Sequence, residues 1–108
     1  SFTWIGDGTD ALAAILRNEG GRADGQIFNI GNPSNNVSIR ELAETILGTM
    51  REMPRFAART DGVRVVSVPA ESYNRVPCVD KIRNLLGWTP RVSLKESVRR
   101  TLEGFEER

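Results

Sequence analysis

The sequence predicts an α/β fold: a small, helix-rich lobe with a few short strands. Two observations carry this prediction. Apolar residues recur at helical spacing in several segments, most clearly over residues 39–50. Two shorter runs, residues 26–30 and 63–68, are rich in residues that favour strands and are bounded by turn-forming residues. We therefore expect a single domain across residues 1–108, with short strands between amphipathic helices.

The first expected elements are the end of a strand at residues 2–5 and a helix from about residue 10 to residue 18. Residues 6–9 supply turn and cap residues ahead of this helix. Gly20 and Gly21 follow it, because glycine is the residue best suited to a positive φ in such a connection.

In the middle of the chain we expect a strand at residues 26–30, then the helix that contains residues 39–50, and then a strand at residues 63–68. Ser38 and Glu41 stand three residues apart and predict a capping box at the start of the helix. Pro54 ends the helix. The apolar residues of the helix share one face: Ile39, Leu42, Ala43, Ile46, Leu47 and Met50.

Two helices are expected to close the chain. Asp80 is a natural cap for a short helix over residues 81–86, and Gly87 is the expected residue just past its end. Ser93 and Glu96 repeat the spacing of a capping box and predict the start of the last helix.

The composition excludes several classes of function. The 15 basic and 14 acidic side chains are mixed along the sequence and give a net charge of +1, so nucleic acid is not an expected partner. No segment approaches the roughly 20 apolar residues that cross a bilayer, so no membrane partner is expected. Cys78 is the only cysteine and histidine is absent, which argues against an internal disulfide, a zinc site and a histidine-based triad. A cytoplasmic location is expected.

Three segments carry a resemblance to a known family. They are Phe2-Thr3-Trp4-Ile5-Gly6-Asp7, then Phe28-Asn29-Ile30-Gly31-Asn32-Pro33, and finally Arg75-Val76-Pro77 leading to Leu85-Leu86-Gly87-Trp88-Thr89-Pro90. In this order and spacing, the chain resembles the carboxy-terminal third of extended short-chain dehydrogenases/reductases of the NAD-dependent epimerase/dehydratase family, which act on nucleotide sugars. Within that family it is most similar to UDP-glucuronate decarboxylases, such as the decarboxylating half of the bifunctional polymyxin-resistance enzyme.

The resemblance implies that this chain is the carboxy-terminal, substrate-binding part of an extended Rossmann-type dehydrogenase. NAD would then be held by an amino-terminal Rossmann domain that is absent here. Gly6 and Gly8 lack the third glycine of the dinucleotide fingerprint. Tyr73 is the only tyrosine and Pro77 stands four places on, so the Tyr-x-x-x-Lys pair is missing too. We expect no cofactor in this chain and no activity of the chain alone; a UDP-sugar and the Rossmann domain are the expected partners, and an oligomer stays open.

Arg75 is the one catalytic position that the resemblance transfers. In the decarboxylating relatives, the arginine before x-Pro lies at the sugar-nucleotide site and assists proton delivery after carbon dioxide leaves. A guanidinium suits this place because its planar fork pairs with diphosphate or carboxylate oxygens at two points. Tyr73 is a second candidate, for stacking on the nucleotide or hydrogen bonding to it. The family usually has a longer loop here, so either the loop is shorter in this protein or a stretch of it is missing from this sequence. The alternative for both residues is an ordinary exposed position on a loop.

Other polar and small residues are interpreted structurally. We expect Asp7 to cap a helix rather than to act as an acid or base, Gly31 to supply backbone dihedrals at a strand exit, and Cys78 to be inert. Two functions stay open. The chain is either the sugar-nucleotide-binding part of an NAD-dependent nucleotide-sugar decarboxylase, epimerase or dehydratase, or a non-catalytic, stand-alone relic or interaction module with the same fold. We expect a fragment, because the sequence begins abruptly with apolar residues.

Overall fold

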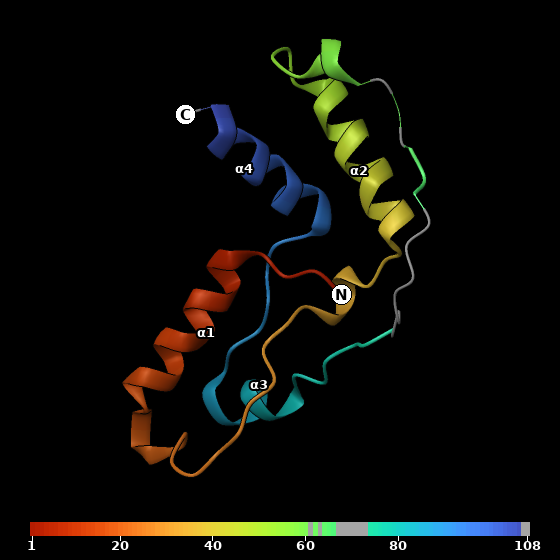
Figure 1. The fold of residues 1–108 in the computed structure, drawn as a ribbon. Coiled ribbons are helices and arrows are strands. Elements are labelled where there is room, and N and C mark those ends of the chain that lie inside the picture. Colours follow the sequence, from red (N-terminus) through yellow and green to blue (C-terminus); the bar gives the residue numbers. More distant parts are fainter. Residues whose placement is uncertain (61, 63, 67–73, 107–108) are drawn as a thin grey trace. The chain divides into compact units, whose positions relative to one another are not determined.

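The computed structural model describes residues 1–60, 62, 64–66 and 74–106 (Figure 1). Within these residues, four α-helices and three short 3-10 helices are joined by irregular segments. The α-helices are α1 (Ile5–Arg17), α2 (Ile39–Glu52), α3 (Asp80–Leu86) and α4 (Leu94–Glu106); the 3-10 helices are η1 (Glu19–Gly21), η2 (Pro33–Asn35) and η3 (Ala57–Arg59). None of the helices in this part of the chain has the length and apolar content that a membrane-spanning helix needs.

The predicted α/β class is wrong for the described residues, which contain no strand and no sheet. Residues 2–5 do not end a strand, because Ile5 is already the first residue of α1. Residues 26–30 have no regular secondary structure, and neither do residues 64–66 of the third expected strand; residues 63, 67 and 68 lie outside the described residues.

The reason for the missing strand at residues 26–30 is the lack of a pairing partner. The segment keeps the alternation of a strand: Phe28 and Ile30 are half-buried against the core, whereas Ile27 between them is 85% exposed. However, no backbone hydrogen bond pairs residues 27–30 with another described segment. Because a strand is stable only as part of a sheet, strand-like side chains alone do not produce one.

Helix α1 begins at Ile5, well before the expected start near residue 10. The helix therefore includes Gly6 and Gly8, which the sequence suggests as turn residues. Tertiary hydrogen bonds to Asp7 in the first turn, described below, hold this part of the chain in the helix. The end of the helix agrees with the prediction, since Gly20 and Gly21 have positive φ values of 61° and 69°.

The start of α2 and the end of α3 follow local sequence chemistry as predicted, whereas the capping box expected at Ser93 and Glu96 stays a prediction. Ser38 Oγ accepts a hydrogen bond from the Glu41 amide at 3.1 Å, and the Ser38 amide donates to Glu41 Oε2 at 2.7 Å, so the capping box of α2 is confirmed. Gly87 ends α3 with a φ of 70°, also as predicted. One detail differs: Asp80 is the first helical residue of α3, and Val79 occupies the cap position.

The chain divides into two compact units. Unit 1 comprises residues 1–36 and 75–93 and contains α1 and α3; unit 2 comprises residues 37–74 and 94–108 and contains α2 and α4. The core of unit 1 consists of Ala11, Val79, Ile82 and Trp88, with Ile15, Phe28, Ile30 and Leu86 packed against it. Trp88, in the third family-like segment, is thus a core residue of unit 1.

Unit 2 is built on the packing of α2 against α4. Thr49 on α2 and Val98 on α4 are buried, and Lys95 forms an ion pair with Glu52 at 2.9 Å. The exposed surface of α4 carries a second set of charges: Glu96 Oε1 accepts hydrogen bonds from Arg99 at 2.6 Å and from Arg100 at 2.8 Å. These hydrogen bonds lower the pKa of Glu96 to about 2.

Candidate functional site

The first two of the three family-like segments are joined by hydrogen bonds in unit 1. The amide of Asn32, in the second segment, donates to Thr3 Oγ1, in the first, at 2.9 Å. The amide of Phe2 donates to the carbonyl of Asn35 at 3.1 Å. Residues 2–3 therefore lie against the turn that follows residues 26–30.

The second segment is also in direct contact with the third. Gly31 is buried, and a Cβ atom built on it would lie only 2.5 Å from Cγ of Pro77. The Asn29 side-chain amide donates to the carbonyl of Cys78 at 3.5 Å. The φ of Gly31 is not positive, so the predicted dihedral role of this glycine is wrong. Gly31 is required because Pro77 occupies the space of a side chain.

Asp7 connects α1 to the segment that follows α3. Its carboxylate Oδ2 accepts hydrogen bonds from the amides of Arg91 at 3.1 Å and Val92 at 3.0 Å, and its carbonyl accepts one from Trp88 Nε1 at 3.0 Å. Asp7 is only 5% exposed. It lies inside the helix and does not cap it, because Trp4 holds the cap position. The predicted cap role is therefore wrong, and the carboxylate instead accepts hydrogen bonds from the backbone of residues 91 and 92.

A second polar connection converges on the carbonyl of Val92. The side-chain amides of Asn32 and Asn35 both donate to this carbonyl, at 3.2 and 3.1 Å, and Oδ1 of Asn32 accepts from the amide of Ser34 at 3.0 Å. Both asparagines are buried. Sequence reasoning missed these contacts, because residues 31–36 are typical of a turn and nothing in them indicates a distant partner.

Arg75 is exposed and lies two residues before Pro77. The contact between Gly31 and Pro77 therefore holds the backbone close to this arginine. Tyr73, the second predicted site residue, lies outside the described residues. The structure thus joins the three family-like segments in one unit, with Arg75 on the segment that leads into α3.

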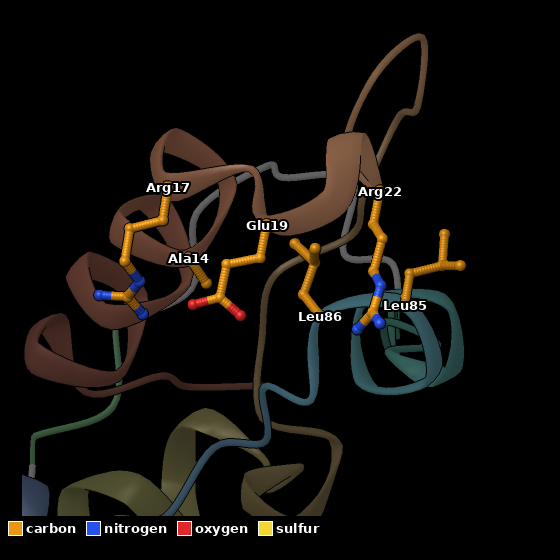
Figure 2. Close-up of a pocket in the computed structure, with 6 residues that line it drawn as sticks. All are labelled: Ala14, Arg17, Glu19, Arg22, Leu85 and Leu86. Atoms are coloured by element: carbon orange, nitrogen blue, oxygen red, sulfur yellow. The ribbon is translucent and has the colours of Figure 1, made fainter.

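Unit 1 also contains two hollows beside α1. The smaller has a volume of about 50 Å³; Figure 2 shows its lining, with Arg17 on α1, Glu19 and Arg22 on the turn after α1, and Leu86 at the end of α3. The larger has a volume of about 250 Å³ and shares part of this lining. It is lined by Asp7, Asp10, Ala13, Ala14, Arg17, Leu86, Gly87, Trp88, Thr89 and Arg91. Arg75 lines neither hollow.

Charge and size argue against a diphosphate site in these two hollows. Arg17 and Arg91 are offset by Asp7 and Asp10 in the larger hollow, so a bound diphosphate would meet carboxylates as well as guanidinium groups. The larger hollow is also below the range of about 300–1,000 Å³ that is usual for small-molecule sites. The side chains of the described residues contain no cluster of three or more potential metal ligands. A sugar nucleotide would therefore need binding groups in addition to those that line these two hollows.

Comparison with known proteins identifies a structural neighbour. No family model matches the chain. The crystal structure of the PbgP3 protein from Burkholderia pseudomallei matches 99% of this chain, with a TM-score of 0.85 and 38% sequence identity. The match covers 31% of that protein, so this chain spans about a third of the length of its neighbour. The two proteins are similar in sequence and in fold over nearly all of this chain.

Proposed function

We propose that this chain is the sugar-nucleotide-binding part of an NAD-dependent nucleotide-sugar decarboxylase, epimerase or dehydratase, and that its ligand is UDP-glucuronate or a related UDP-sugar. The observation that carries the proposal is the match of nearly the whole chain to about a third of PbgP3. Its three family-like segments also support the proposal, because hydrogen bonds and the contact between Gly31 and Pro77 join them in unit 1. Segments that resembled a family by chance would have no reason to lie together.

In this proposal, NAD is bound by another domain of a longer protein and not by this chain. Gly6 and Gly8 lie inside α1 and not in a loop between a strand and a helix, where a dinucleotide-binding fingerprint is found. Space beside Gly6 is also taken, because a Cβ atom there would lie 2.5 Å from Nε1 of Trp4. Gly6 and Gly8 therefore do not form such a loop, and we propose that another domain of the longer fold binds NAD.

Arg75 is the proposed contact of this chain with the sugar nucleotide. Arg75 is an exposed residue, and the planar guanidinium group suits the oxygens of a diphosphate or of the glucuronate carboxylate. The contact between Gly31 and Pro77 fixes the backbone two residues away from Arg75. Tyr73 is proposed as a second contact. A cytoplasmic location is also part of the proposal, in keeping with the free and exposed Cys78.

Calorimetric titration of the chain with UDP-glucuronate tests the proposal. We expect weak binding that Arg75→Ala lowers by about tenfold or more, as for the loss of a charge-assisted pair. The matched control is Arg51→Ala, which removes another exposed arginine, from the last turn of α2, and leaves the affinity unchanged. An affinity that is the same in the Arg75 variant removes the proposed contact. Absence of binding to any UDP-sugar favours the alternative of an interaction module. Tight binding of NAD to this chain contradicts the proposal that another domain binds NAD.

A further inference from the structure

The larger hollow of unit 1 is lined by charges of both signs. Asp10, Arg17 and Arg91 are exposed residues of its lining. None of these three side chains takes part in an ion pair or a hydrogen bond with another residue in the part of the chain that the structure describes. Both a carboxylate and guanidinium groups are therefore available to a ligand in this hollow.

The three charges are spread along helix α1. The amide of Arg91 donates to Asp7 Oδ2 at 3.1 Å, so the backbone of Arg91 lies beside the first turn of the helix. Asp10 stands one turn after Asp7, and Arg17 stands about 10 Å beyond Asp10 along the helix axis. Asp10 and Arg91 therefore lie towards one end of the hollow, and Arg17 lies towards the other.

Between these charges the lining is small and apolar. Ala13 and Ala14 are half-buried on α1, Leu86 ends α3, and Trp88 follows shortly after it. The volume of about 250 Å³ is far above the roughly 10–15 Å³ that a single water molecule needs. A short aliphatic chain with charged groups at both ends suits this lining.

We propose that the hollow binds a small amino acid with an acidic side chain, of the class of glutamate. The ammonium group of the ligand pairs with Asp10, its α-carboxylate with Arg91 and its side-chain carboxylate with Arg17. The fourth charged residue, Asp7, is not needed, because its Oδ2 already accepts two backbone amides. The mixed charges that disfavour a diphosphate suit such a ligand, since each of its ionic groups meets a group of opposite sign.

Titration of the ¹⁵N-labelled chain with L-glutamate, followed by the amide chemical shifts of Gly87 and Thr89, tests the proposal. We expect shifts that saturate with ligand concentration. Asp10→Asn and Arg17→Gln are each expected to raise the Kd by about two- to fivefold, as for the loss of an exposed ion pair. The matched control Arg22→Gln removes an exposed arginine that lines only the smaller hollow, and it is expected to leave the Kd unchanged.

Two analogues of glutamate test the contacts one at a time. Glutarate lacks the ammonium group and is expected to bind more weakly than glutamate. Asp10→Asn is then expected to strengthen the binding of glutarate, because it removes the repulsion between two carboxylates. Likewise, 4-aminobutyrate lacks the α-carboxylate, so we expect Arg91→Gln to weaken the binding of glutamate but not that of 4-aminobutyrate.

The possible outcomes separate this inference from the proposed function. Absence of saturable shifts overturns it, as does a Kd for glutamate that Asp10→Asn and Arg17→Gln leave unchanged, or glutarate that binds as tightly as glutamate. UDP-glucuronate that shifts the same amides makes the hollow part of the sugar-nucleotide site and also overturns it. Glutamate binding with the expected variant effects, in a chain that binds no UDP-glucuronate, supports the inference and contradicts the proposed function. The amide spectrum of each variant without ligand checks that its fold is kept.

Discussion

Replacement of Gly31 by alanine is the sharpest test of the packing that joins the family-like segments. The new methyl carbon would lie 2.5 Å from Cγ of Pro77, 3.3 Å from its Cβ and 3.7 Å from its Cδ. Nonbonded carbon atoms prefer a separation of about 3.5–4.0 Å. The nearest contact is therefore about 1 Å too short, and the proline ring has little freedom to move aside.

The expected cost follows from two opposing effects. Overpacking at a closely packed position costs about 1–3 kcal/mol. Alanine also restricts the unfolded chain, which offsets about 0.4–1 kcal/mol of that cost. We therefore expect Gly31→Ala to lower the free energy of unfolding by roughly 1–2 kcal/mol.

Urea unfolding followed by circular dichroism measures this change. Gly8→Ala is the matched control, since Gly8 lies in α1 of the same unit and a Cβ atom there would meet nothing within 4 Å. Alanine in the helix interior is expected to raise the free energy of unfolding by about 0.5–1 kcal/mol. The account of Gly31 is refuted if its alanine variant is as stable as the parent chain, or if both variants lose stability equally.

Three further predictions concern Asp7 and the helix ends. Asp7→Ala leaves two backbone amides without their acceptor and is expected to lower the free energy of unfolding by about 2–3 kcal/mol, with Asp7→Asn intermediate; urea unfolding that shows no loss contradicts the anchoring role. Ser38→Ala removes the capping box of α2 and is expected to cost about 1 kcal/mol in the same assay, whereas an unchanged midpoint contradicts it. Because the pKa of Glu96 is lowered from 4.5 to about 2 in the folded chain, its contribution is complete above pH 4.5 and is lost as the pH falls towards 2. We expect helix content to fall over this range, by less in Glu96→Gln and in high salt; identical acid titrations of both proteins would argue against the pairs of Glu96 with Arg99 and Arg100.

The helices could be predicted where their signals are local. Ser38 and Glu41 stand one turn apart, so the capping box needs no distant partner. Gly87 ends α3 for an equally local reason, the positive φ that follows the last helical residue. In contrast, the start of α1 depends on hydrogen bonds from residues 88–92 to Asp7, and no local pattern indicates them.

The strand-like run at residues 26–30 failed as a prediction for a related reason. Phe28 and Ile30 do pack against the core, and they alternate with exposed residues as in a half-buried strand. Pairing, however, depends on a second strand, which no local pattern supplies and the described residues do not contain.

In the candidate site, too, local features could be predicted from the sequence and long-range contacts could not. Arg75 was predicted as a site residue from a short motif, and the proline of that motif is packed on Gly31. The contacts that hold the segments together could not be predicted, because the partners of Val92 are far away in the sequence: Asp7 stands 85 residues away, Asn32 60 and Asn35 57. Contacts over such separations depend on the whole fold.

The most direct test of the central claim follows the guanidinium of Arg75 itself. In a ¹⁵N-labelled chain, the Nε–H resonances of the arginines can be monitored by nuclear magnetic resonance during addition of UDP-glucuronate, with Arg75→Lys used to assign the signal. We predict that the Arg75 resonance shifts with ligand concentration and saturates. A titration that shifts Arg17, Arg22 or Arg91 and leaves Arg75 unchanged would put the ligand in the hollows beside α1 and contradict the claim.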